Sequence, residues 1–341
     1  MIGKLKNTFI LFFTVLSLVS CGDDRGGWQV STPMIKSRFA SSVIVNDNNI
    51  YAIGGADSRG YIWDAEWSTF DDSGNIKEWK RAPSLNEPRG YVPGVYHNGF
   101  LYVVGGANGE HGANLLDTVE RAKINPDGSI GRWVVEDSVM TTARRGGQAT
   151  VIDGYLYAIG GYNGMFLHSV ERAEIKEDGS LDKWAELTPM MFERYIHSSL
   201  AVGDVLYSMG GHKNASGGAL KEVEYGKISK DSLEVQWHSA PSLNEARYDA
   251  GVVFADGAIY IAGGYDDNAI DTVEKSRVGA DGVLSKWNVV SKLPSPVYGA
   301  ALVNQKGKLY LVGGAYGGSG NKEVSPLVYA VDIEKLGRGV E

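Results

Sequence analysis

The stretch Tyr157-Ala-Ile-Gly-Gly161 is followed by Ser169-Val-Glu-Arg172 and then by Trp184. The same order of residues returns along the chain, each time starting with an apolar run that ends in two glycines. The doublets are Gly54-Gly55, Gly105-Gly106, Gly160-Gly161, Gly210-Gly211, Gly263-Gly264 and Gly313-Gly314. They follow one another at steps of 51, 55, 50, 53 and 50 residues. Six copies of one unit therefore make up most of the chain.

Other positions keep step with the doublets. A tyrosine stands three residues before each one: Tyr51, Tyr102, Tyr157, Tyr207, Tyr260 and Tyr310. Val-Glu follows at Val119-Glu120, Val170-Glu171, Val223-Glu224 and Val273-Glu274, with Ala65-Glu66 as a variant, and a tryptophan comes later at Trp79, Trp133, Trp184, Trp237 and Trp287. Short, β-branched, turn-bounded runs predict strands. No unit can bury both of its faces alone, so the sequence predicts an all-β ring that closes on itself.

This pattern resembles the kelch repeat over residues 28–333. The period favours it, because kelch units are about 50 residues long whereas WD40 units are about 40–45. One departure is that segments such as Arg172-Ala-Glu-Ile175 replace the family's usual Tyr-Asp-Pro after Val-Glu. The resemblance implies a six-bladed kelch β-propeller, formed by residues 28–341 as one domain.

The sequence also predicts how the ring of blades closes. The sixth unit lacks a terminal tryptophan, but Trp28 stands ten residues before Arg38, as Trp79 stands ten before Arg89. We therefore expect the strand around Trp28 to be the outer strand of the last blade, where it protects an open edge.

The N-terminus resembles a bacterial lipoprotein signal. Lys4 and Lys6 precede an apolar run, Thr8–Ser20, which is short for a membrane span of about 20 residues and typical of a secretory signal. The run ends in Leu18-Val19-Ser20-Cys21, similar to a lipobox. We expect a signal peptide at 1–20 and a tether at 21–27, with acyl chains such as palmitate on Cys21. The alternative is an ordinary signal peptide with a chance cysteine.

Lipidation implies a bacterial envelope location, at the outer membrane or cell surface rather than the inner membrane. Cys21 is the single cysteine of the 341 residues, which excludes an intramolecular disulfide and a cysteine-rich zinc cluster. The net charge of −8 leaves no broad basic surface for nucleic acid.

Five arginines share one position, sixteen residues before a doublet: Arg38, Arg89, Arg144, Arg194 and Arg247. In the sixth unit one residue is taken as inserted, which makes Pro296 the equivalent. Two interpretations stay open. Each arginine could pair with a glutamate of a Val-Glu position or cap strand-end carbonyls. Alternatively, the five could converge at one mouth of the channel as a site for carboxylate or phosphate.

The kelch resemblance bears on the second interpretation. Animal kelch adaptors that bind acidic peptides use arginines at this position and a tyrosine after the doublet, which matches Tyr162 and Tyr265 here. Further mouth candidates adjoin the arginines or follow a doublet: Arg145, Tyr195, His197, His212, Tyr248, Asp249 and Tyr298.

Known kelch chemistries fit less well. Galactose oxidase needs a cysteine cross-linked to tyrosine, which this chain does not offer. In sialic acid mutarotases a catalytic glutamate replaces one doublet glycine, whereas all six doublets are intact here, although Asp249 could supply a carboxylate. The six histidines have no metal-binding spacing, so we expect neither metal nor cofactor.

The sequence thus favours an envelope-tethered module that binds an anionic or carbohydrate ligand, or a protein partner, at an arginine-lined mouth. One alternative is an enzyme acting on an acidic sugar, such as an epimerase or mutarotase. Another is a structural component of a surface complex that binds through blade sides or loops.

Overall fold

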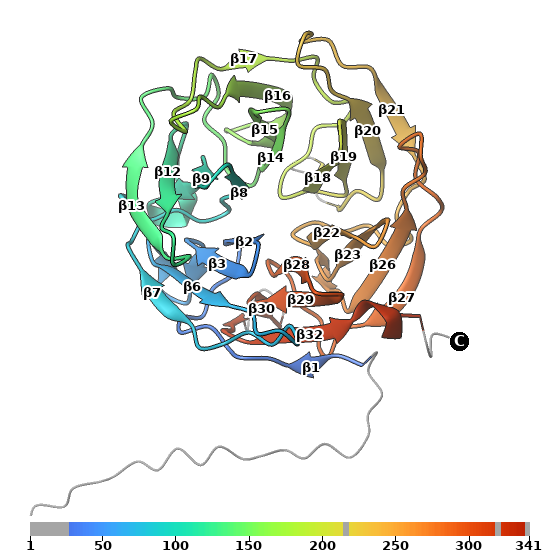
Figure 1. Cartoon of the computed structure of the whole chain (residues 1–341). Helices are drawn as coiled ribbons and strands as arrows, with labels where there is room; N and C mark the ends of the chain where they lie inside the picture. The colour runs from blue at the N-terminus through green and yellow to red at the C-terminus, as the bar shows by residue number, and fades with distance from the viewer. Residues whose placement is uncertain (1–26, 214–217, 318–321, 338–341) are drawn as a thin grey trace, which may run out of the picture.

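The computed structural model describes residues 27–213, 218–317 and 322–337. Within these ranges the chain forms six four-stranded antiparallel sheets, arranged as blades around a central axis (Figure 1). This arrangement confirms the predicted six-bladed all-β propeller. The expected signal peptide at 1–20 and Cys21 lie outside the described residues. In the described part of the chain, no helix is long and apolar enough to cross a membrane.

Each blade runs outward from the axis. The first three blades are β2 (Ser42–Asn46), β3 (Asn49–Ile53), β6 (Ala65–Thr69) and β7 (Lys80–Ala82); β8 (Gly94–His97), β9 (Phe100–Val104), β12 (Val119–Ile124) and β13 (Ile130–Val135); and β14 (Gln148–Ile152), β15 (Tyr155–Tyr162), β16 (Phe166–Glu174) and β17 (Ala185–Glu186). The next two are β18 (Ser198–Val202), β19 (Val205–Met209), β20 (Val223–Lys227) and β21 (Trp237–Ala240); and β22 (Gly251–Ala255), β23 (Ala258–Ala262), β26 (Thr272–Arg277) and β27 (Asn288–Lys292).

The sixth blade is built from both ends of the chain. It consists of β28 (Ala301–Gln305), β29 (Lys308–Val312), β32 (Val328–Asp332) and, outermost, β1 (Gln29–Val30). Gln29 pairs with Ala330 and Val30 with Tyr329. The Trp28 indole nitrogen donates to the Ser291 hydroxyl of the fifth blade at 3.2 Å. The predicted closure by the N-terminal strand is therefore confirmed.

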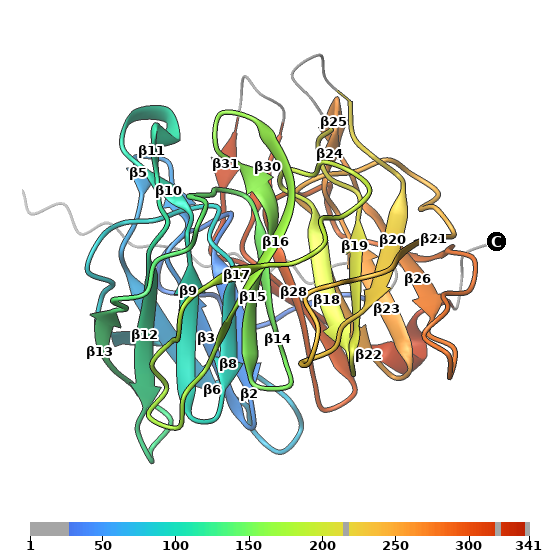
Figure 2. The same cartoon turned by 90° about the horizontal axis from the view of Figure 1, so that it is seen from above.

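Short hairpins follow the doublets and stand together at one end of the ring, which we call the mouth (Figure 2). They are β4 (Ala56–Asp57) with β5 (Gly60–Tyr61), β10 (Ala107–Asn108) with β11 (Asn114–Leu115), β24 (Tyr265–Asp266) with β25 (Asn268–Ala269), and β30 (Ala315–Tyr316) with β31 (Glu323–Val324). In the third blade, β15 and β16 themselves extend into such a hairpin. Two short 3-10 turns, η1 (Glu110–Gly112) and η2 (Ile333–Lys335), complete the described elements.

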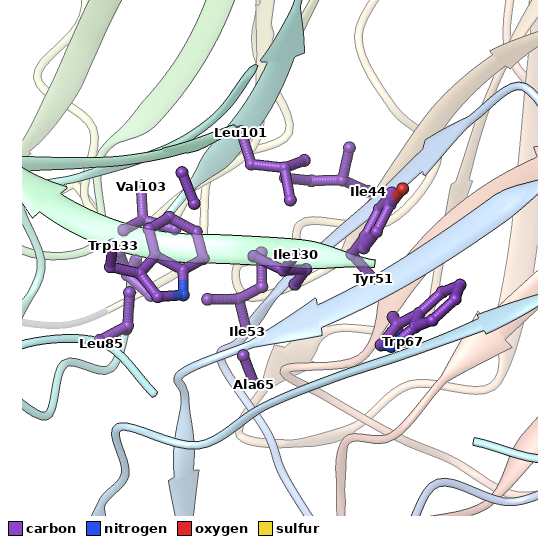
Figure 3. Packing of buried hydrophobic residues seen from close by; sticks show 12 residues of the cluster. Ile44, Tyr51, Ile53, Ala65, Trp67, Leu85, Leu101, Val103, Ile130 and Trp133 are labelled. Carbon is purple, nitrogen blue, oxygen red and sulfur yellow. The ribbon is translucent and has the colours of Figure 1, made fainter. Parts of the chain in front are cut away.

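The core lies between neighbouring blades rather than within one. Between blades one and two, Tyr51 and Trp67 face Leu101 and Trp133, and all four side chains are at most 6% exposed (Figure 3). The repeated tyrosine also links blades by a hydrogen bond. Tyr51 donates to the Gly128 carbonyl at 2.9 Å, which is in the outer turn of the next blade. These contacts explain why one aromatic position recurs with every unit.

The doublets are required by close approach between blades. Each first glycine has a positive φ between 55° and 67°. A Cβ there would lie within 2.9 Å of a carbonyl oxygen at the start of the next blade. Only glycine tolerates both conditions, so the sequence repeat marks the points where one blade meets the next.

Candidate functional site

The five arginines sixteen residues before the doublets are buried, with at most 2% of each exposed. Each forms a salt bridge of 2.5 to 2.9 Å with the glutamate that follows the repeated valine or alanine of its own blade. The pairs are Arg38–Glu66, Arg89–Glu120, Arg144–Glu171, Arg194–Glu224 and Arg247–Glu274. We call this set the Arg–Glu tier.

The tier is satisfied by further hydrogen bonds. Each guanidinium donates to the carbonyl of the first doublet glycine at 2.5 to 3.0 Å. The glutamate also accepts a backbone N–H, as in the 2.7 Å bond from Met191 to Glu224. Burial lowers the pKa of every one of these arginines, and the paired glutamate opposes the shift.

These are the contacts of the first interpretation, in which arginine pairs with glutamate and caps carbonyls. The arginine-lined mouth of the second interpretation is replaced by a buried tier. The physical reason is that a buried guanidinium needs a carboxylate and acceptors around it, and the blade provides them internally. None of the five side chains lines the central cavity.

The sixth blade lacks the pair, and its register corrects the sequence assignment. The second doublet glycine of each blade donates to the carbonyl of the arginine in the next blade, and Gly264 donates in the same way to Val297 at 2.8 Å. Val297 is therefore the equivalent position, not Pro296, because the sixth blade has no inserted residue. Tyr329 occupies the position of the glutamate, beside Val328, so the cation and the anion are absent together.

Two residues after each of these positions, the backbone forms a closed circle. The six residues have φ values between 49° and 63°: Ala40, Tyr91, Gly146, Ile196, Asp249 and Gly299. Each donates its N–H to the carbonyl of the residue in the preceding blade, at 2.7 to 3.0 Å. This neck ring joins all six blades around the axis. Its non-glycine members adopt a conformation that is uncommon and concentrated at functional sites.

The neck ring borders a central cavity of about 220 Å³. Small residues in or just before the innermost strands line most of it, including Ser42, Gly147, Ser199 and Gly251. Asp249 and Tyr91 line it as well and are the largest polar groups of the neck ring. Serine side chains and Gln148 add further polar groups to the lining.

Tyr91 and Asp249 face each other across the axis, because they are three positions apart in a ring of six. Neither side chain has a hydrogen-bond partner among the described residues. Burial below the mouth raises the pKa of Asp249 to about 7, and the positive charge of Lys322 opposes this shift. The Asp249 side chain is nevertheless partly exposed to the cavity. Burial likewise raises the pKa of Tyr91 well above its usual range. Sequence reasoning missed Tyr91, but it shares the register position of Asp249.

Above the neck ring, aromatic side chains form a continuous arc from the third blade to the sixth. Neighbouring ring centroids are 5.1 to 5.9 Å apart. The members of this aromatic arc are Tyr162, Phe166, Tyr195, His212, Tyr248, Tyr265 and Tyr298. The arc thus brings together six predicted mouth residues and one, Phe166, that sequence reasoning missed. The six are Tyr162, Tyr195, His212, Tyr248, Tyr265 and Tyr298.

Two cations stand on opposite sides of the mouth, in the third and sixth blades. The Arg145 guanidinium lies 5.1 Å from the centre of the Tyr162 ring and donates to the carbonyls of His111 and Gly112. The Lys322 ammonium lies 3.1 Å from the centre of the Phe39 ring. Arg145 was among the sequence candidates, whereas Lys322 had no repeat signal because it follows a Gly-rich stretch of sequence outside the repeat.

His197 does not belong to the mouth. It is 1% exposed, and neither ring nitrogen has a partner among the described residues. Burial lowers its pKa well below the usual range, and the nearby Arg194 and Arg144 add to the shift. His197 is therefore a neutral packing residue beside the Arg–Glu tier. In the described ranges, no three histidine, cysteine, aspartate or glutamate side chains are grouped to hold a metal ion.

Comparison with known proteins agrees with this architecture. A family model described as Kelch motif matches residues 143–172 and 246–275. The chain is 28% identical to Kelch-like protein 36 of Bos taurus over 241 residues, and 27% identical to Beta-scruin of Limulus polyphemus over 212 residues. These matches cover 70% and 61% of this chain but only 37% and 23% of the relatives' lengths.

The solved structure of YjhT superposes with a TM-score of 0.67 at 14% identity, covering 87% of this chain and 95% of the other. At this identity the likeness concerns the fold alone. Together with the repeat register and the closed ring of blades, these findings identify the repeats of this chain as kelch motifs arranged in a six-bladed propeller.

Proposed function

We propose that this kelch propeller is a binding module that takes an anionic carbohydrate, a sugar acid, at its mouth. The observation that supports the proposal is the aromatic arc with Arg145 and Lys322 on opposite sides and Asp249 and Tyr91 on the floor. The proposal keeps the ligand class inferred from the sequence and transfers its recognition from the five buried arginines to these groups of the mouth and neck ring.

The chemistry of the mouth suits such a ligand. Sugar rings present C–H faces that pack on aromatic side chains, and their hydroxyls need polar partners with unused hydrogen-bonding capacity. The Asp249 carboxyl and the Tyr91 phenol have that capacity. A carboxylate on the sugar pairs with a guanidinium or an ammonium, and both are present on an otherwise acidic protein.

The test is calorimetric titration of the purified protein with glucuronate and sialic acid, with glucose as the neutral sugar. We expect a sugar acid to bind and glucose to bind at least about tenfold more weakly. Arg145→Ala and Lys322→Ala should each weaken binding about tenfold or more, a loss of roughly 1.4 kcal/mol. Arg59→Ala is the matched control, because Arg59 is an 80% exposed arginine in a hairpin on the same face. Unchanged affinity in both mouth variants contradicts the proposal.

We further propose that the module is tethered to a bacterial envelope through lipid on Cys21. The support is the sequence pattern around that residue, which lies outside the described residues. Expression of Cys21→Ser in a diderm bacterium should shift the protein from the membrane fraction to the soluble fraction. Continued membrane association of this variant counts against the tether.

An enzyme acting on an acidic sugar is the second candidate, and Asp249 favours it. A carboxyl group whose pKa is raised to about 7 has the protonation behaviour of a general acid or base near neutral pH. Nuclear magnetic resonance of sialic acid anomers and uronic acid epimers, with and without protein, measures turnover. Catalysis that Asp249→Asn abolishes while sugar-acid binding persists supports the enzyme. Absence of any interconversion supports the binding module alone.

A further inference from the structure

The neck ring holds the backbone of Asp249 beside the central cavity, which its side chain helps to line. Its backbone is held by two ring bonds of 2.8 Å, one donated to Ile196 and one accepted from Gly299. A Cβ on Gly299 would lie 3.2 Å from an Asp249 carboxyl oxygen, so the glycine leaves the carboxyl its room. Because no described residue bonds that carboxyl, its capacity is left for a ligand.

The groups that face Asp249 give its negative charge little support. They are the phenols of Tyr91, Tyr195, Tyr248 and Tyr298 and the ammonium of Lys322. Lys322 already lies against the Phe39 ring, and it forms no salt bridge with Asp249 among the described contacts. Burial outweighs its attraction and raises the pKa of Asp249 to about 7. Ionised and neutral forms therefore coexist near neutral pH.

We propose that Asp249 determines specificity at the mouth by acting as a neutral carboxylic acid that donates a hydrogen bond to the ligand's anionic group, so that binding takes up one proton. This inference rests on the proposed function. An ionised carboxylate only accepts hydrogen bonds and repels an anion, whereas the protonated acid donates one. An anion in the mouth therefore stabilises the protonated form, and affinity depends on pH through that single group.

The first test follows the affinity for glucuronate and sialic acid from pH 5.5 to pH 8.5, where both sugar acids are ionised. We expect the affinity of the wild type to fall toward a slope of about tenfold per pH unit as pH rises well above 7. Proton uptake, measured by calorimetry in two buffers of different ionisation heat, should approach one per bound ligand at pH 8.5. Asp249→Asn is the sharpest variant, since asparagine tolerates positive φ and mimics the neutral acid as a donor.

Asp249→Asn should bind the sugar acid at pH 8 as the wild type does at pH 6, without the pH dependence. Tyr91→Phe is the matched control on the opposite side of the neck ring and should keep the wild-type pH slope. An Asp249→Asn variant with the wild-type slope overturns the inference, and so does binding without proton uptake. In both cases the proposed function stands, because the sugar acid still binds.

A ligand-free measurement covers the case in which neither sugar acid binds and the proposed function fails. Unfolding frees Asp249 to ionise above its ordinary pKa near 4, so a neutral carboxyl in the fold costs stability as pH rises toward 7. Asp249→Asn removes that cost. We expect its melting temperature to exceed that of the wild type by about 3 °C or more at pH 8, with a much smaller difference at pH 4. The same difference at both pH values overturns the inference without any ligand.

Discussion

Arg144 and Arg145 are adjacent in the sequence and have opposite surroundings. The Arg144 guanidinium is buried against Glu171 and the Gly160 carbonyl. The Arg145 guanidinium faces the mouth, where it stacks near Tyr162 and Tyr195. Successive side chains of an extended segment point to opposite sides, so a shift of one residue separates a scaffold group from a ligand-facing group.

The difference teaches that residue type alone does not identify the site. The repeated arginines of five blades belong to the scaffold, and the single, unrepeated Arg145 belongs to the mouth. A residue that every blade needs for its own folding tends to be repeated, whereas a residue that contacts the ligand differs from blade to blade. The neck ring shows the same contrast, because its backbone bonds repeat in all blades while its side chains range from glycine to tyrosine.

The largest effect is expected from Arg144→Ala. This change leaves Glu171 buried without its cation, and removing one partner of a buried ion pair typically costs about 3–5 kcal/mol. Urea denaturation followed by tryptophan fluorescence measures the free energy of unfolding, and Arg59→Ala serves as the exposed control. A loss below about 1 kcal/mol would mean that the Arg–Glu tier is not part of the scaffold.

The sixth blade suggests a second and smaller effect. Arg247→Val and Glu274→Tyr copy its residues, Val297 and Tyr329, into the fifth blade. Each single change leaves one buried charge without its partner, whereas the double variant removes both charges. We expect the double variant to lose less free energy of unfolding than the two single variants lose together, by about 1–3 kcal/mol in a double-mutant cycle. Strict additivity would contradict the pairing.

The third expected effect is a loss of stability at acid pH caused by His197, which lies beside the Arg–Glu tier. The fold holds this imidazole neutral, and the unfolded chain protonates it near pH 6.5, so the free energy of unfolding falls as pH drops below that value. The slope from this one group is about 1.4 kcal/mol per pH unit. His197→Gln should flatten the stability curve between pH 6.5 and 5, and exposed His111→Gln should not. Equal slopes in all three proteins would refute this assignment.

The smallest effect on stability is expected from Arg145→Ala. The side chain loses two hydrogen bonds to backbone carbonyls and two cation–π contacts, together worth about 1–2 kcal/mol at a partly exposed site. Thermal denaturation beside Arg144→Ala measures the contrast directly. If both variants unfold alike, the division between the Arg–Glu tier and the mouth fails.

Much of the fold was accessible from the sequence, since each unit repeats the residues that join it to its neighbour. The doublets, the buried tyrosines and Trp28 were enough to predict six blades and their closure. The site was accessible only in part. Asp249, Arg145 and every arc residue except Phe166 were candidates because they adjoin the repeated positions. Tyr91 and Lys322 were not candidates, because no role was expected of Tyr91 and Lys322 follows a Gly-rich stretch of sequence outside the repeat.

The sequence by itself determined the repeat, the number of blades and the strand that closes the ring, because these depend on local patterns with a regular period. Only the tertiary structure decided which arginines are buried and which side chains meet at the axis. Burial and encounter depend on the register of six blades around one centre. Residues such as Tyr91 and Asp249, 158 positions apart in the chain, come to face each other across the axis only when the ring is closed.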